Sequence, residues 1–140
     1  MQAQIFWPVL AVAIVPMVVL LLNAKRKDAD RKTGNLDPNA AIDNRAWSLP
    51  VVLTSNSLEN QFQLPVIFYV LCFVLFSIGA VSTFAMVLAY VFALSRWAHA
   101  YVHVTSNYIP QRMVLFGVGV ITLLILFGVT FISLLSVSSV

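Results

Sequence analysis

The sequence predicts an all-α, integral membrane four-helix bundle, and three observations carry that prediction. Of its 140 residues, 61% are hydrophobic and only 9% are charged, against about 25% in soluble domains. Long apolar runs recur along the chain, and ten of the thirteen charged side chains fall between positions 24 and 48. These features exclude a soluble enzyme, a nucleic-acid-binding module or a disordered tail as the main body, and the length allows one bundle.

The four membrane spans are expected at about 5–22, 50–81, 82–104 and 110–135, in a single membrane domain that covers residues 1–140. The first has 18 apolar residues, or about 27 Å of helix, which matches a hydrocarbon core of about 30 Å. Pro16 predicts a kink within it, and Pro65 predicts a bend within the second span. Gly79 and its neighbours leave room only for a tight turn, so the second and third spans form an antiparallel hairpin. Pro110 suits the first turn of the fourth span.

The basic residues set the expected orientation. Six of the eight Lys and Arg residues lie in the segment 24–48, and the remaining two, Arg96 and Arg112, flank the connection near 105–110. By the positive-inside rule we expect both connections on the cytoplasmic side and both termini on the extracytoplasmic side.

Polar residues form a stripe at the start of the second span. Asn56, Glu59, Asn60 and Gln63 recur at i, i+3, i+4 and i+7, which is one face of a helix. This pattern predicts that the helix starts near Leu49 or Pro50, well before the continuous apolar run.

A second stripe, formed by Arg96, His99 and His103, ends the third span. Both helices rise about 1.5 Å per residue from the turn near 81/82, so Asn60 should lie level with His103. Ionisable groups within a membrane are costly unless they are paired, and Glu59 with Arg96 is therefore the expected ion pair. Arg112 enters the same layer from the fourth span. We interpret this layer as a functional site; no metal site is expected, because the two histidines lack an evident third ligand.

At these residues the sequence resembles the MAPEG family, the membrane-associated proteins in eicosanoid and glutathione metabolism. The motifs are Asn56-Ser57-Leu58-Glu59-Asn60 at the second span, Arg96-x-x-His99 at the third and Pro110-x-Arg112 at the fourth. The similarity is to bacterial-type members. The sequence departs from the family pattern at positions 52–55, which hold Val, Leu, Thr and Ser where Arg and His are common, and at His103, which takes the place of a Tyr.

The resemblance implies a homotrimer that uses glutathione as a co-substrate at the cytoplasmic end of the bundle and acts on a lipophilic small molecule. The similarity to bacterial-type members implies the bacterial inner membrane. The composition already implies a lipid bilayer around the protein, and the confinement of the basic residues largely to one segment gives no reason to expect a nucleic-acid partner. Arg112 is the expected catalytic residue, because a guanidinium favours the reactive thiolate. The residues expected to bind glutathione are Asn56, Glu59, Asn60, Arg96, His99, His103 and Arg112.

Three interpretations of function stay open at this point. The first is a glutathione-dependent transferase or peroxidase for lipophilic electrophiles or lipid hydroperoxides. The second is a non-catalytic accessory or structural subunit with the same fold, in which the polar layer only joins helices. The third is a small transporter or channel, although a path across the bilayer needs polar groups at more than one depth.

Overall fold

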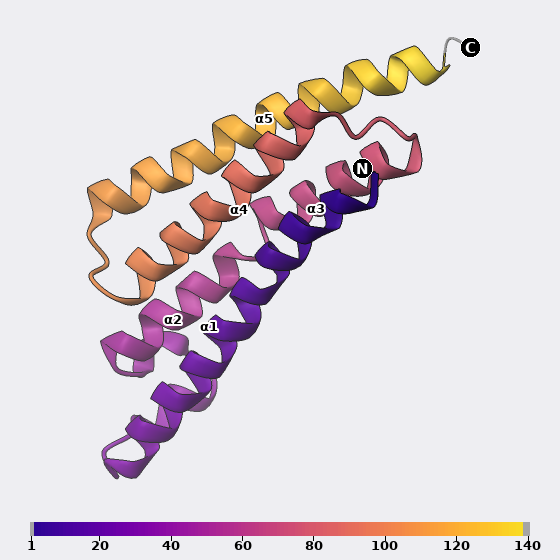
Figure 1. The fold of residues 1–140 in the computed structure, drawn as a ribbon. Helices are drawn as coiled ribbons and strands as arrows, with labels where there is room; N and C mark the ends of the chain where they lie inside the picture. Colours follow the sequence, from indigo (N-terminus) through magenta and orange to yellow (C-terminus); the bar gives the residue numbers. More distant parts are fainter. Residues whose placement is uncertain (1, 139–140) are drawn as a thin grey trace.

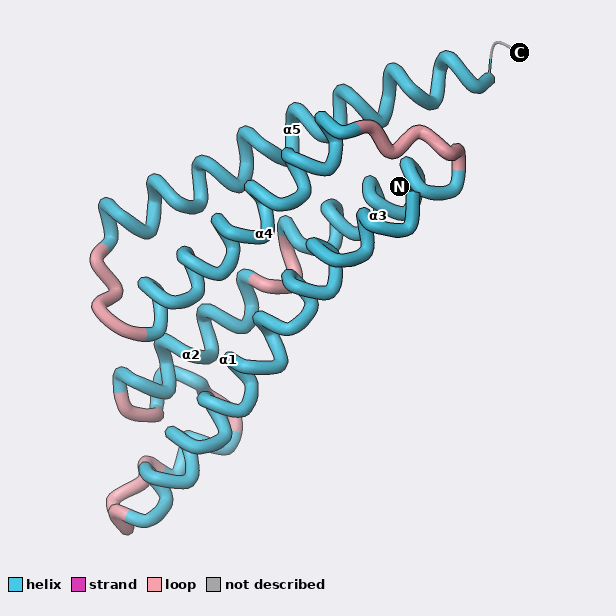
Figure 2. Tube along the Cα trace, in the orientation of Figure 1, coloured by secondary structure: helices cyan, strands magenta, loops and turns pink. Residues whose placement is uncertain are grey.

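The computed structural model describes residues 2–138, and this part of the chain is helical without a strand (Figures 1 and 2). Four helices or helix pairs are long and apolar enough to cross a membrane, which confirms the predicted all-α membrane bundle. The elements are η1 (Gln2–Ile5), α1 (Phe6–Lys32), η2 (Pro38–Ala41), η3 (Asn44–Ala46), α2 (Leu49–Asn60), α3 (Leu64–Ser77), α4 (Thr83–Val104) and α5 (Ile109–Ser138).

Helix α1 continues beyond its apolar part to Lys32, so the first part of the segment 24–48 is helical. The reason is that Lys, Arg and Ala are good helix formers, and a change from apolar to charged residues marks the edge of the bilayer without ending a helix. Asp28 and Lys32 support this last stretch with an ion pair of 2.7 Å one turn apart. The connection to α2 is correspondingly shorter than the expected loop.

The expected second span consists of two helices, α2 and α3, separated by residues 61–63. Pro65 lies in the first turn of α3, where its missing N–H costs no hydrogen bond. In a continuous helix Pro65 could not donate to the Gln61 carbonyl one turn before it, and its ring would clash with that carbonyl, so the chain breaks before α3 starts. The break ends α2 at the level of the polar layer.

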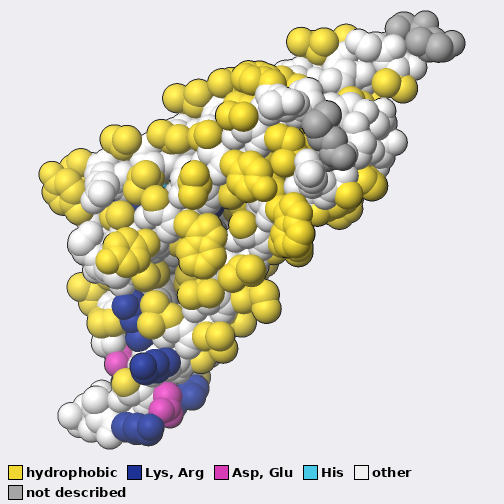
Figure 3. All heavy atoms as spheres, viewed as in Figure 1, with side chains coloured by type: hydrophobic (Ala, Val, Ile, Leu, Met, Phe, Trp, Pro, Cys, Tyr) yellow, Lys and Arg dark blue, Asp and Glu magenta, His cyan; other side chains and the backbone are white. Residues whose placement is uncertain are grey.

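Helix α4 runs through the middle of the bundle and packs against α1, α2 and α5. Phe68 of α3 stacks on Phe92 of α4 with ring centroids 4.5 Å apart. The core at this level consists of apolar side chains from α1, α3, α4 and α5, among them Val12, Leu75, Ala89 and Leu126. The outer surface is also largely apolar, as a bilayer requires (Figure 3).

The two ends of the bundle differ in character. The N-terminus, the α3–α4 turn and the end of α5 lie toward one end, where the Gln2 side chain donates to the Gly79 carbonyl at 2.8 Å and accepts from the Val81 amide at 3.0 Å (Figure 1). The 33–48 segment and the 105–108 turn lie toward the other end, and in Figure 3 the charged side chains gather there. We call this second end the basic end.

Candidate functional site

The centre of the candidate site is Arg96, on the basic half of α4. It is 0% exposed, although arginine is rarely buried without a charged partner. Its Nη2 donates at 3.4 Å to the Asn60 carbonyl and at 3.4 Å to Gln61 Oε1, both at the end of α2. Its Nε and Nη1 have no hydrogen-bond partner within residues 2–138. Both nitrogens are buried, so Arg96 holds two donors that the described residues leave unsatisfied, and such donors call for an acceptor.

Two histidines extend the site from Arg96 toward the basic end. His99 and His103 are each 2% exposed, and their rings meet edge to face with centroids 5.7 Å apart. His103 Nδ1 lies 3.5 Å from the Asn60 side-chain amide, and His99 Nδ1 has no partner in the described part of the chain. The predicted alignment of Asn60 with His103 is thus confirmed.

Arg112 approaches the histidines from α5. Its Nη1 donates to Asn107 Oδ1 at 2.7 Å, and its guanidinium lies close enough to interact electrostatically with both His99 and His103. Phe116, one turn further along α5, contacts the His99 ring with centroids 5.9 Å apart. Two guanidinium groups and two imidazoles thus come together where the end of α2, the basic half of α4 and the start of α5 meet.

The prediction of an ion pair between Glu59 and Arg96 is wrong. Glu59 is exposed, and the ion pair found in residues 2–138 joins Lys32 to Asp28 instead. The reason is the helix phase: neighbouring residues differ by about 100° around a helix, so Asn60 faces α4 while Glu59 points out of the bundle. Asn56 is exposed as well. The structure therefore brings Asn60, Arg96, His99, His103 and Arg112 together, and leaves Asn56 and Glu59 on an outer face.

Sequence reasoning missed Gln61. It lies just past α2, is 2% exposed, and donates from Nε2 to the Ser57 carbonyl at 3.0 Å, which turns its Oε1 toward Arg96. The available signal was Pro65, because a helix that must end before a proline exposes its last carbonyls, and a buried arginine can satisfy them. Sequence reasoning also missed Asn107, the partner of Arg112.

The chemistry that this arrangement can support is the binding of an anion or a strong acceptor. Two buried or half-buried cations lie in the layer, and within residues 2–138 neither forms an ion pair with an acid. Charge-assisted hydrogen bonds from such groups are about twice as strong as neutral ones. No three His, Cys, Asp or Glu side chains in the described part of the chain could hold a metal ion together.

Comparison with known proteins agrees with the motifs of this layer. A sequence model of the MAPEG family matches residues 4–132, which is nearly the whole chain. No curated protein and no solved structure matches the chain. A match of this extent includes every residue of the candidate site and all but the outer ends of the first and fourth spans, and the chain therefore belongs to the MAPEG family.

Proposed function

We propose that this protein is a glutathione-dependent transferase or peroxidase that acts on lipophilic electrophiles or lipid hydroperoxides. The observation that carries the proposal is Arg96, a fully buried arginine with two nitrogen donors that no group of residues 2–138 fills. Burying a cation in this way costs free energy, and a protein gains from it when a ligand completes the hydrogen bonds. Membership of a family that includes glutathione-dependent enzymes supports the choice of ligand.

Glutathione fits the donor set by its chemistry. It carries two carboxylates, peptide carbonyls and a thiol, and it requires cations and N–H donors around it. Arg96 Nε and Nη1 and His99 Nδ1 are unpartnered and buried, so the proposal requires the layer to open for the ligand. Asn60 and His103 form the adjoining side of the site. These residues are proposed to bind and orient the tripeptide.

Arg112 is proposed to be the catalytic residue. It lies in the first turns of α5, where unpaired backbone N–H groups give the helix a partial positive charge. A fixed cation at a helix N-terminus lowers the pKa of a thiol beside it and so raises the fraction of nucleophilic thiolate. The Asn107 side chain holds the guanidinium in place for this role.

The outer face of α2 supports a homotrimer. Asn56 and Glu59 are exposed one turn apart, at the same level as the buried site. Polar and charged side chains at membrane depth are unfavourable against lipid and are retained where they contact a protein or a ligand. We therefore propose that a neighbouring subunit covers this face, and that Asn56 and Glu59 contact glutathione where two subunits meet.

The experiment is calorimetric titration of the detergent-purified protein with glutathione, comparing wild type with Arg96→Ala and Arg112→Ala. Arg45→Ala removes a cation from the exposed connection and is the control. The proposal predicts binding by wild type and the control, and at least tenfold weaker binding by the two site variants. Undetectable binding by wild type at millimolar glutathione would overturn it.

Turnover separates the proposed enzyme from the non-catalytic accessory subunit. Conjugation of glutathione to a general electrophile is measured in the same preparations. Stimulated conjugation that Arg112→Ala abolishes supports catalysis, whereas binding without stimulation supports the accessory role. Native mass spectrometry of the same samples tests the trimer, and a monomer that still binds glutathione would contradict the proposed position of the site between subunits.

A further inference from the structure

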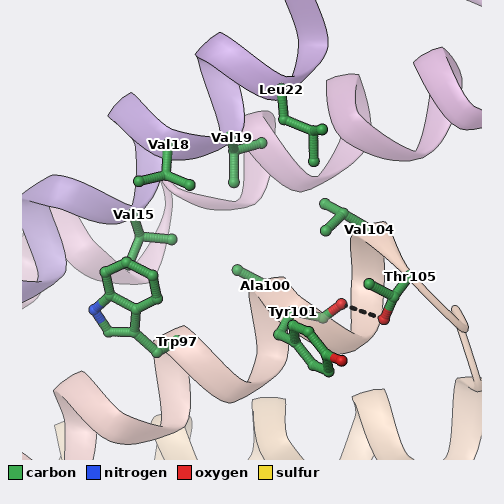
Figure 4. A pocket seen from close by; sticks show the side chains of 9 residues that line it. All are labelled: Val15, Val18, Val19, Leu22, Trp97, Ala100, Tyr101, Val104 and Thr105. Atoms are coloured by element: carbon green, nitrogen blue, oxygen red, sulfur yellow. Dashed lines mark hydrogen bonds between the residues drawn. The ribbon is translucent and has the colours of Figure 1, made fainter. Parts of the chain in front are cut away.

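We propose that the groove between α1 and α4 is a binding site for one anionic phospholipid, with an acyl chain along the groove and the head group at Lys25 and Arg26. The groove is separate from the Arg96 layer, and it does not depend on glutathione. It has a volume of about 300 Å³ (Figure 4).

The walls of the groove are apolar. Side chains of Val15, Val18, Val19 and Leu22 line the α1 side, and Ala100 and Val104 belong to the α4 side (Figure 4). Ala100 has a short side chain that contacts the Val15–Val19 cluster and leaves space beside it. From Val15 to Leu22 the wall is about 10 Å long and follows the helix axis. This shape and chemistry fit an extended alkyl chain.

The groove is closed toward the middle of the bundle. Trp97 lies at that end, and its Nε1 donates to the Ala11 carbonyl of α1 at 2.8 Å. The opposite end, at Leu22 and Thr105, lies toward the basic end. A lipid tail that lies along the groove with its head group at the basic end would therefore point toward Trp97.

The face of α1 that lines the groove becomes cationic at this open end. Positions 15, 18, 19 and 22 continue along the same face to Lys25 and Arg26, at spacings of three and four residues. Arg26 crosses to the mouth of the groove, where it donates at 2.8 Å to the Val104 carbonyl of α4 and at 2.8 Å to the Pro50 carbonyl. Because both acceptors are neutral, its charge is not cancelled, and Lys25 beside it is exposed.

The two acids of this part of α1 have partners other than Lys25 and Arg26. Asp28 pairs with Lys32, and Asp30 accepts hydrogen bonds from the Ser48 amide and hydroxyl. Lys27, on the opposite side of α1 from Lys25, lies 4.9 Å from the centre of the Trp47 ring. The mouth of the groove is therefore positively charged, and basic pockets between membrane helices select anionic head groups.

The test is native mass spectrometry of delipidated protein in detergent, titrated with phosphatidylglycerol or with phosphatidylcholine of identical acyl chains. We expect one tightly held phosphatidylglycerol and at least fivefold lower occupancy by phosphatidylcholine. Water-soluble glycerophosphoglycerol, which lacks the chains, should not compete. Equal occupancy by the two lipids would overturn the proposed head-group site, and competition by the soluble head group would overturn the role of the groove.

Matched variants locate the site. Lys25→Gln should reduce phosphatidylglycerol occupancy severalfold, whereas Lys27→Gln removes the same charge two residues away on the other side of the helix and should not. Ala100→Phe fills the groove and should prevent binding. Val18 is partly exposed, so Val18→Trp narrows the groove at less risk to folding, and it serves as the test if Ala100→Phe does not fold. Equal effects of the two lysine variants, or unchanged binding in a folded groove variant, would refute the proposal.

Discussion

The side-chain amide of Asn60 lies 3.5 Å from Nδ1 of His103 and joins the end of α2 to the basic half of α4. These residues are 43 positions apart in sequence, and the Asn60 carbonyl also accepts a hydrogen bond from Arg96 Nη2. The contact fixes the position at which the break after α2 meets α4. It therefore links the shape of the second span to the geometry of the site.

A double-mutant cycle measures this link. Asn60→Ala and His103→Ala should each destabilise the protein, and the pair should show a coupling of about 0.5 kcal/mol, the lower end for a neutral hydrogen bond, because the separation is long. The measurement is the free energy of unfolding in mixed detergent micelles. The control pair is Asn60 with Tyr101, an exposed residue of α4, the helix that also carries His103. The effects of these two substitutions on the free energy of unfolding should be additive. A coupling of zero for Asn60 and His103 would show that the contact does not contribute.

Arg96→Met separates ligand binding from stability. The substitution removes the cost of burying a cation and loses two long hydrogen bonds to neutral oxygens, so the free energy of unfolding should change by no more than about 1 kcal/mol. Glutathione binding should weaken by about 10- to 100-fold, since hydrogen bonds to a charged group contribute about 1.5–3 kcal/mol. Thermal unfolding and calorimetric titration give the two values.

The opposite pattern would assign Arg96 a structural role. In that case Arg96→Met would lower the stability by several kcal/mol and leave the binding constant of the surviving folded protein unchanged. Arg45→Met, on the exposed connection, controls for the loss of one positive charge from the chain.

The level of each residue along the bundle was predictable from sequence, whereas the direction of each side chain was not. The match of Asn60 with His103 follows from a constant rise per residue and a tight turn near Gly79. The failure of the Glu59–Arg96 pair follows from helix rotation, because an error of one residue turns a side chain by about 100°. Residues 61–63 also interrupt the second span, so its faces cannot be extrapolated from the apolar run that follows.

Helix α1 also extends beyond what hydropathy predicted. Hydropathy marks where the membrane ends, near Leu22, but helix propensity decides where the helix ends, at Lys32.

Gln61 was missed because its role depends on where α2 ends. Its side chain bonds to the Ser57 carbonyl and to Arg96 only because the helix stops there, and the periodicity of the sequence does not reveal that end.

Gly119 determines how closely α5 approaches α4. A Cβ atom at this position would lie 3.3 Å from Ser95 Oγ, whereas one at Gly128 would meet nothing within 4 Å. We expect Gly119→Leu to push α5 away and to lower the free energy of unfolding by about 1–3 kcal/mol, as overpacking does. Gly128→Ala should be neutral or stabilising by up to about 1 kcal/mol, because alanine is the better helix former.

The displacement should also affect the site, since Arg112 is carried by α5 and His99 by α4. Gly119→Leu should therefore weaken glutathione binding as well as stability, and Gly128→Ala should leave binding unchanged. Similar stability of the two variants would contradict a close helix contact at Gly119.

Asn107 combines a backbone role with a side-chain role, and two substitutions separate them. Its φ of 48° lies in the left-handed region, and its Oδ1 accepts the Arg112 hydrogen bond. Asn107→Ala should lower the free energy of unfolding by about 1–2 kcal/mol relative to Asn107→Gly, because glycine adopts this conformation without strain. Both variants release Arg112, and conjugation of glutathione to a general electrophile should slow equally in both. Unequal conjugation rates in the two folded variants would mean that the backbone of the 105–108 turn, and not the Asn107 side chain, positions Arg112.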